Sequence, residues 1–151
     1  MARLNKLEKK WNKYTEGWFG VIVYLVLGFI IAYFFNIFLT MVFNTQTPVV
    51  AVFSESMIPT FFKGDMIIVY GTNNLKVGDV IVFQVFDRAY PIIHRIISIE
   101  NGTIRTKGDN NPGPDPERWE TSSDDVLGKA MVNIPLLGWV KILFVDITGI
   151  A

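Results

Sequence analysis

The sequence contains no cysteine and only one histidine among its 151 residues. Without cysteine the chain cannot form disulfides, supply a thiolate nucleophile or build a cysteine metal site. All imidazole chemistry must come from His94. We therefore expect no metal and no cofactor, and any domain that forms must be stabilised by its hydrophobic core alone.

Charge is missing from a long stretch of the chain, because no charged residue occurs from Gly17 to Ser54. The 26 residues from Trp18 to Phe43 are almost wholly apolar. A helix needs about 20 such residues to cross a bilayer. The run is too long for the apolar region of a cleavable signal peptide, and it lacks the polar face of a core helix. Residues 17–43 are therefore predicted to be a transmembrane anchor.

The net charge of zero hides an asymmetry. Residues 1–16 carry five basic and two acidic side chains, a net charge of +3, and the remaining 135 residues carry −3. Basic residues that flank a span favour the cytoplasmic side. We expect a cytoplasmic segment at 1–16 and an exoplasmic domain after the anchor. A basic tail that binds nucleic acid would be expected farther from an apolar span, so no nucleic-acid partner is predicted.

After the anchor, short β-rich runs alternate with turn residues, which is typical of a small all-β domain. We predict a mainly β fold in residues 44–133, behind one N-terminal transmembrane helix. The tail, residues 134–151, is apolar but interrupted by Pro135, Lys141 and Asp146. It is predicted to pack on the domain or to lie in the membrane interface. The predicted strands are Val49–Phe53, Met66–Tyr70, Val80–Phe86, Ile92–Glu100, Thr103–Thr106 and Val126–Ile134.

His94 begins a segment centred on Asn101-Gly102. Asn-Gly between strands favours a two-residue hairpin loop. If the ladder continues without a bulge, this register places His94 opposite Asp109. A carboxylate beside an imidazole can set its tautomer, as in a serine-protease triad. An ordinary cross-strand pair is the alternative.

Ser54 and Ser56 directly follow the first predicted strand. Serines in this position are commonly turn or capping residues. A serine hydroxyl becomes a good nucleophile only when a base takes its proton. The candidate bases in this domain are His94, several carboxylates and five lysines.

Five motifs in order resemble those of the type I signal peptidases, especially the archaeal and endoplasmic-reticulum branch. They cover about residues 49–132, behind an anchor in the expected place. The bacterial enzymes carry a lysine at the position of His94, so the histidine indicates the other branch. The motifs are Ser54–Thr60, Gly64–Val69, Val77–Phe83, Ile92–Arg95 and Thr106–Asn111, with Asp115 six residues after Asp109.

The resemblance implies a catalytic domain of coiled antiparallel sheets and a role for each site residue. Ser56 would be the nucleophile and His94 the general base. Asp115 would be the triad acid and Asp109 a supporting residue, which conflicts with the hairpin register. Because a bulge would break that register, we favour Asp115. Ser54 would donate its hydroxyl to the oxyanion hole, whereas a turn hydrogen bond is the alternative.

The predicted function is removal of N-terminal signal peptides from translocated preproteins at the outer membrane surface, through an acyl-enzyme. The partners expected are preproteins, the lipid bilayer and a translocation or peptidase complex. The expected location is the cell membrane, or the endoplasmic reticulum membrane in a eukaryote. Two alternatives are a self-cleaving serine peptidase of the LexA type and a membrane-anchored, non-enzymatic β domain that binds a partner. The spanning segment, the histidine and the lack of a DNA-binding region disfavour the first.

Overall fold

The computed structural model describes residues 17–88 and 90–149, so the predicted cytoplasmic segment, residues 1–16, lies outside the described residues. The chain divides into two compact units, Met1–Leu39 and Thr40–Ala151. The second unit contains the β domain and the tail, which we expected to pack on the domain or to lie in the membrane interface.

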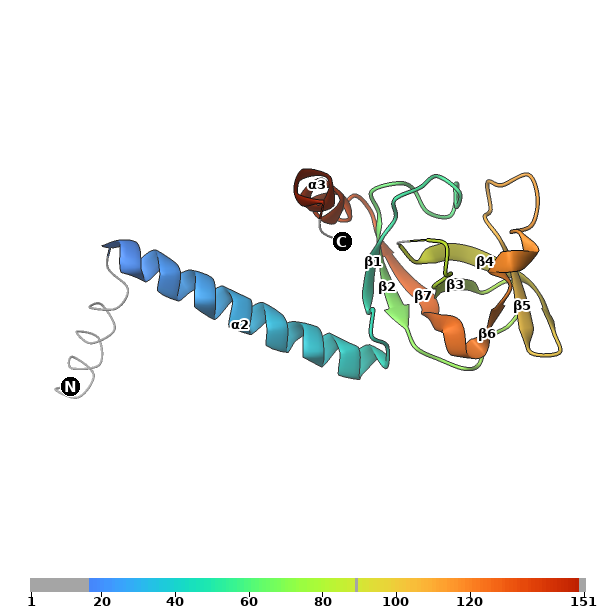
Figure 1. The fold of residues 1–151 in the computed structure, drawn as a ribbon, viewed down its shortest axis with the longest axis horizontal. Helices are drawn as coiled ribbons and strands as arrows, with labels where there is room; N and C mark the ends of the chain where they lie inside the picture. The colour runs from blue at the N-terminus through green and yellow to red at the C-terminus, as the bar shows by residue number, and fades with distance from the viewer. Residues whose placement is uncertain (1–16, 89, 150–151) are drawn as a thin grey trace. The chain divides into compact units, whose positions relative to one another are not determined.

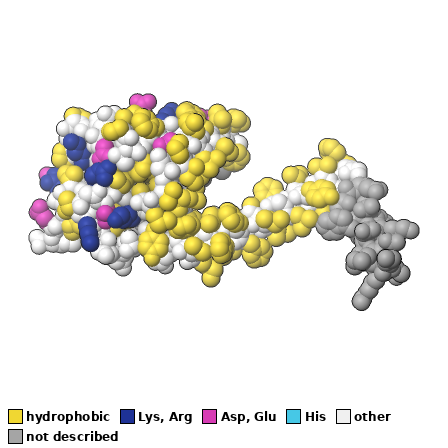
Figure 2. Space-filling view, turned by 180° about the vertical axis from the view of Figure 1, so that it is seen from behind, with side chains coloured by type: hydrophobic (Ala, Val, Ile, Leu, Met, Phe, Trp, Pro, Cys, Tyr) yellow, Lys and Arg dark blue, Asp and Glu magenta, His cyan; other side chains and the backbone are white. Residues whose placement is uncertain are grey.

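Helix α2 runs from Gly17 to Phe43, the bounds predicted for the anchor. Its best 18-residue window has a mean hydropathy of 2.5, and no part of that window is buried. Figure 2 shows hydrophobic side chains along the whole helix, whereas the charged side chains in this view lie on the β unit. By length and composition, α2 can therefore cross a membrane.

The β unit is a single seven-stranded sheet with the order β1-β2-β7-β3-β4-β5-β6, in which all neighbours are antiparallel. Figure 1 shows the sheet curling strongly on itself. The mainly β prediction is confirmed. The strands are β1 (Val49–Ala51), β2 (Met66–Tyr70), β3 (Val80–Phe83), β4 (Ile92–Glu100), β5 (Thr103–Lys107), β6 (Thr121–Ser122) and β7 (Val126–Ile134).

Strand β3 joins two hydrophobic clusters because successive side chains of a strand point to opposite faces. Val80 and Val82 belong to one cluster, and Ile81 and Phe83 belong to the other. All four residues are buried. Because both faces of β3 are covered, the run Val-Ile-Val-Phe is apolar throughout and does not alternate between apolar and polar residues. The next strand, β4, is paired along β3 and carries His94 opposite Ile81.

The hairpin of β4 and β5 has the predicted loop. Asn101 and Gly102 both have positive φ, as a type I′ turn requires. The predicted register holds from Glu100 opposite Thr103 to Ser98 opposite Arg105. A bulge at Ile97 then shifts it, so that Ile96 pairs with Thr106. The expectation that His94 faces Asp109 is therefore wrong, because one extra residue in β4 displaces every later pair.

The tail contains a helix that was not predicted, α3 (Trp139–Thr148). Ile142 and Val145 are buried, so α3 packs within the β unit, as one of our two expectations for the tail proposed. Trp139 lies over Gly64, where a Cβ would come within 2.0 Å of the indole nitrogen. Gly64 also has a positive φ of 94°. Glycine is thus required there both for the backbone conformation and for docking of the tail.

Candidate active site

The candidate nucleophile, Ser56, lies in the loop between β1 and β2. Its Oγ is 3.0 Å from Nε2 of His94, which is 4% exposed. Nδ1 of His94 is 2.5 Å from Oδ2 of Asp115. An ionised carboxylate only accepts hydrogen bonds, so Nδ1 donates to Asp115 and Nε2 accepts from the Ser56 hydroxyl. The serine is therefore oriented to transfer its proton to the imidazole.

Asp115 is held by contacts besides that with His94. Its side chain is 5% exposed, and its Oδ2 also accepts a hydrogen bond from Thr106 Oγ1 at 2.6 Å. Its backbone N–H donates to the carbonyl of Thr106 at 2.9 Å. The polar segment that follows β5 thus folds back onto β5, and this places Asp115 within hydrogen-bond distance of the imidazole.

Asp109 lies beside Arg95 and not beside His94. The guanidinium of Arg95 donates from Nε to Oδ1 at 2.8 Å and from Nη2 to Oδ2 at 2.6 Å. Thr60 ends the motif Ser54–Thr60, which carries Ser56 and is called the nucleophile segment below. The Thr60 hydroxyl donates to the same carboxylate at 2.5 Å. These hydrogen bonds, chiefly those from Arg95, hold the pKa of Asp109 below its usual value. Asp109 therefore ties the nucleophile segment to β4.

The loop that carries Asp109 also docks directly on the nucleophile segment. The backbone N–H of Asn110 donates to the carbonyl of Ser56 at 2.8 Å. A Cβ on Gly108 would lie 2.7 Å from the same carbonyl oxygen, so a larger residue would push the two loops apart. The side chain of Ser54 lies next to the nucleophile, with its Oγ 3.1 Å from Oγ of Ser56.

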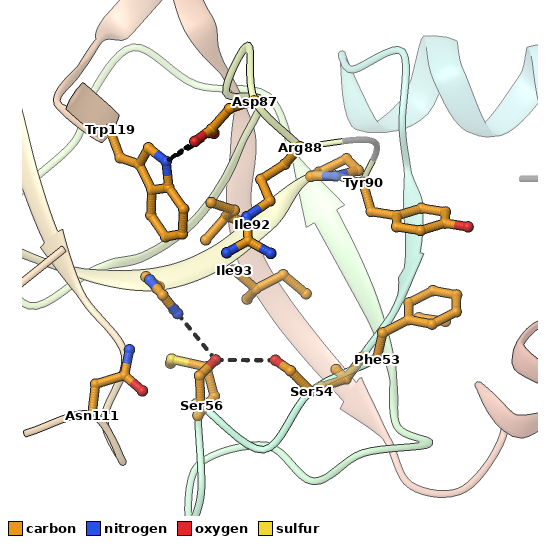
Figure 3. A pocket seen from close by; sticks show the side chains of 15 residues that line it. Phe53, Ser54, Ser56, Asp87, Arg88, Tyr90, Ile92, Ile93, Asn111 and Trp119 are labelled. Atoms are coloured by element: carbon orange, nitrogen blue, oxygen red, sulfur yellow. Dashed lines mark hydrogen bonds between the residues drawn. The ribbon is translucent and has the colours of Figure 1, made fainter. Parts of the chain in front are cut away.

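Of these residues, Ser54, Ser56 and His94 line a cleft of about 610 Å³ (Figure 3). In this view Phe53 and Tyr90 close one end, where their rings stack with centroids 5.3 Å apart. Asn111 and Trp119 lie at the other end. The lining residues are Ala51–Ser54, Ser56, Met57, Asp87, Arg88, Tyr90–His94, Asn111 and Trp119.

A hydroxyl, an imidazole and a carboxylate joined in this order beside an open cleft form the arrangement that serine hydrolases use for acyl transfer. Comparison with known proteins agrees. Residues 32–131 match the Peptidase S24-like family. The chain belongs to this family, and it is a serine endopeptidase, as the resemblance predicted.

Individual relatives indicate the branch of the family to which the chain is similar. The chain is 35% identical to the signal peptidase complex catalytic subunit SEC11 of Verticillium alfalfae over 117 residues, which cover 70% of this chain and 68% of the relative. It is 39% identical to that of Dictyostelium discoideum over 70% of this chain and 66% of the relative. For Lodderomyces elongisporus, the identity is 32%, over 79% of this chain and 80% of the relative. The resemblance to signal peptidases is therefore confirmed, and the non-enzymatic alternative is not supported.

Several residues at and around the cleft could not be assigned a role from the sequence. Arg95 and Thr60 fell within the motifs, but nothing in their spacing indicated that they share Asp109. Asp87, Arg88 and Trp119 gave no signal, because they come from two loops that meet only in the folded chain. The packing of Thr106 against Asp115 was equally hidden, since the bulge at Ile97 decides which way that part of the hairpin faces.

Proposed function

We propose that this chain removes N-terminal signal peptides from translocated preproteins, with Ser56 as nucleophile, His94 as general base and Asp115 as triad acid. The observation that carries the proposal is the continuous hydrogen-bonded chain from Ser56 Oγ through His94 to Asp115. The relatives' names, which describe catalytic subunits of a signal peptidase complex, supply the substrate class.

In the first half of the reaction, Ser56 Oγ attacks the scissile carbonyl carbon while its proton moves to Nε2 of His94. Asp115 stabilises the resulting imidazolium through its hydrogen bond to Nδ1. When the C–N bond breaks, His94 gives the proton to the leaving amine of the mature protein. The signal peptide remains as an ester on Ser56. In the second half, water attacks this ester, His94 takes the water's proton, and Ser56 regains it as the signal peptide leaves.

Ser54 is proposed to stabilise the oxyanion of each tetrahedral intermediate, together with the backbone N–H of Ser56. Because the Ser56 hydroxyl donates to His94, the Ser54 hydroxyl is the donor in the 3.1 Å contact between the two serines. Its proton therefore already lies beside Ser56 Oγ, next to the place where the charge develops. Donors of this kind contribute most when they point to where charge forms in the transition state.

The substrate is proposed to bind as an extended strand in the cleft. Strand β4 pairs with β5 only from Arg95 onward, so within the described residues no strand pairs with that edge of β4 at Ile92–His94. The segment after β1, Val52–Ser54, lines the cleft as well. An added strand can use such edges for backbone hydrogen bonds while its alternate side chains enter the cleft.

A membrane location is part of the proposal, with α2 as the anchor. The positive charge of residues 1–16 favours a cytoplasmic N-terminus and an exoplasmic catalytic unit. Only 13 positions separate Phe43 from Ser56, at most about 43–47 Å of extended chain. The site would then lie near the outer membrane surface, next to the end of a signal peptide's apolar core. By analogy with the relatives, the chain would act within a peptidase complex.

The proposal is tested by incubating a model preprotein with the purified full chain in lipid vesicles and sequencing the new N-terminus. The wild type should release the mature protein at a single bond, and Ser56→Ala should release none. Cleavage by Ser56→Ala at the wild-type rate would show that Ser56 is not the nucleophile.

Topology is tested separately by adding protease to sealed spheroplasts. The loop around Asp115 should be cut from outside, whereas protection of that loop until lysis would reverse the orientation.

A further inference from the structure

One wall of the cleft is built from two loops that sequence reasoning did not connect with the site. Asp87 and Arg88 come from the loop between β3 and β4. Trp119 ends the short 3₁₀ helix η1 (Glu117–Trp119). All three line the cleft together with Ser54, Ser56 and His94. This wall therefore faces the space that a substrate would occupy.

The negative charge of Asp87 is already satisfied within this wall. The indole N–H of Trp119 donates to both carboxylate oxygens, at 2.9 and 3.1 Å. Arg118 donates from Nε to the same carboxylate at 3.1 Å. The hydrogen bond from Trp119, followed by the contacts with Arg118, holds the pKa of Asp87 below its usual value. Asp87 thus remains ionised and serves to fix the indole.

The positive charge of Arg88 has no such partner. Its guanidinium carbon lies 4.8 Å from the centroid of the Trp119 ring, a cation–π contact that orients the group. Figure 3 shows the guanidinium directed into the cleft. Among the described residues, no carboxylate forms an ion pair with Arg88, whereas Arg118 on the same indole pairs with Asp87. Arg88 therefore presents an uncompensated cation to the cleft.

Apart from Asp87 and Arg88, the lining side chains are apolar or neutral, with the imidazole of His94 as the remaining basic group. We propose that Arg88 determines specificity by binding an acidic side chain of the substrate polypeptide close to the scissile bond and by disfavouring a cationic one. This inference rests on the proposed function, since it assigns a substrate charge preference to the same cleft. An oriented guanidinium is suited to this role because it binds a carboxylate through two parallel hydrogen bonds.

The size of the preference follows from the exposure of Arg88. Ion pairs at exposed positions contribute little, because water and salt screen them. We therefore expect about a 5-fold preference for a carboxylate over the matching amide, and a similar discrimination against an ammonium group. The effect should shrink as salt is raised from about 50 mM to about 500 mM.

The test uses the full chain in vesicles and a set of peptides with one cleavable sequence. Glu, Gln or Lys is placed in turn at each of the three positions on either side of the scissile bond, and kcat/KM is measured. At one or more positions the wild type should prefer Glu over Gln and Gln over Lys. Arg88→Gln should lose this order, and Arg88→Glu should reverse it. Arg105→Gln removes an arginine from β5, outside the cleft, and should keep the wild-type order.

Equal rates for the three peptides at every position, or an unchanged preference in Arg88→Gln, would overturn the inference. Binding of the same peptides to Ser56→Ala, followed by fluorescence anisotropy, separates this failure from that of the proposed function. If the wild type cleaves nothing yet Ser56→Ala binds the Glu peptide about 5-fold tighter than the Gln peptide, the charge preference stands and the proposed reaction fails. If cleavage occurs without any charge preference, the proposed reaction stands and the role assigned to Arg88 fails.

Discussion

Asp109 and Asp115 lie six positions apart in the same polar segment, yet they occupy different environments. Asp115 faces His94, whose charge changes as it accepts and releases a proton. Asp109 faces Arg95, whose charge is permanent. A carboxylate beside a titratable base can assist each proton transfer, whereas one beside a fixed cation can only hold the structure. The same side chain is thus suited to catalysis in one place and to positioning in the other.

The largest effect is expected from Asp115→Asn. The replacement carboxamide can donate its N–H to Nδ1, which would place the imidazole proton on Nε2 and prevent it from accepting the proton of Ser56. In triads such a change costs roughly 10⁴ in kcat. Preprotein processing by the variant measures the loss, and circular dichroism checks that the fold is retained. Normal processing would assign the role of triad acid to another residue.

Ser54→Ala removes a proposed oxyanion donor and leaves both aspartates unchanged, so it isolates the part of the site that contacts the reacting carbonyl. We expect kcat to fall by about 10²–10³ with little change in KM, since the hydrogen bond strengthens only when the oxyanion forms. Steady-state kinetics on a model preprotein separate the two parameters. An unchanged kcat would leave Ser54 as a turn residue.

Asp109→Asn should have the opposite signature from Asp115→Asn, with a smaller loss of activity and a larger loss of stability. Displacement of the nucleophile segment should lower kcat by about 10- to 100-fold. Loss of the charge-assisted hydrogen bonds from Arg95 should lower the free energy of unfolding by about 1–2 kcal/mol at pH 7. Kinetics and urea unfolding of both variants measure the two quantities.

The pH dependence of the free energy of unfolding provides a control for Asp109→Asn. The folded-state pKa of Asp109 is lowered, so its contribution to stability is present above the unfolded pKa of about 3.9 and is lost as the pH falls through the folded pKa. The stability difference between wild type and Asp109→Asn should therefore shrink in acid. A difference that stays constant down to about pH 2 would show that the ion pair does not stabilise the fold.

The smallest effect is expected from Thr106→Val, which keeps the shape of a buried side chain and removes its hydrogen bond to Asp115. The carboxylate keeps its contact with His94, so kcat should fall only about 5-fold. A loss as large as that of Asp115→Asn would mean that Thr106, and not the aspartate alone, fixes the imidazole.

Much of the fold was predictable, because its signals are local. The bounds of β2, β4 and β7 agree with the predicted runs, and so do those of α2. Strand β6 was missed because Thr121–Ser122 is too short to show alternation. Helix α3 was missed because Lys141 and Asp146 interrupt an apolar segment that follows Pro135, and its stability comes from packing of Ile142 and Val145.

The candidate site was predictable in its residues and not in its geometry. The motifs indicated Ser56, His94 and both aspartates. Which aspartate meets the imidazole depends on the bulge at Ile97 and on the backbone hydrogen bond from Asp115 to Thr106, neither of which has a local signal. The wall formed by Arg88 and Trp119 was invisible for the same reason, since two loops 31 positions apart create it.

Transfer of a proton from Ser56 to His94 is the central step of the proposed reaction. It is tested most directly by reacting the purified full chain with a fluorophosphonate and locating the adduct by mass spectrometry, with heat-denatured chain as the control. The native wild type should carry the adduct on Ser56, and His94→Ala should react at least about 100-fold more slowly. An adduct on another serine, or an unchanged rate in His94→Ala, would contradict the assignment of this pair.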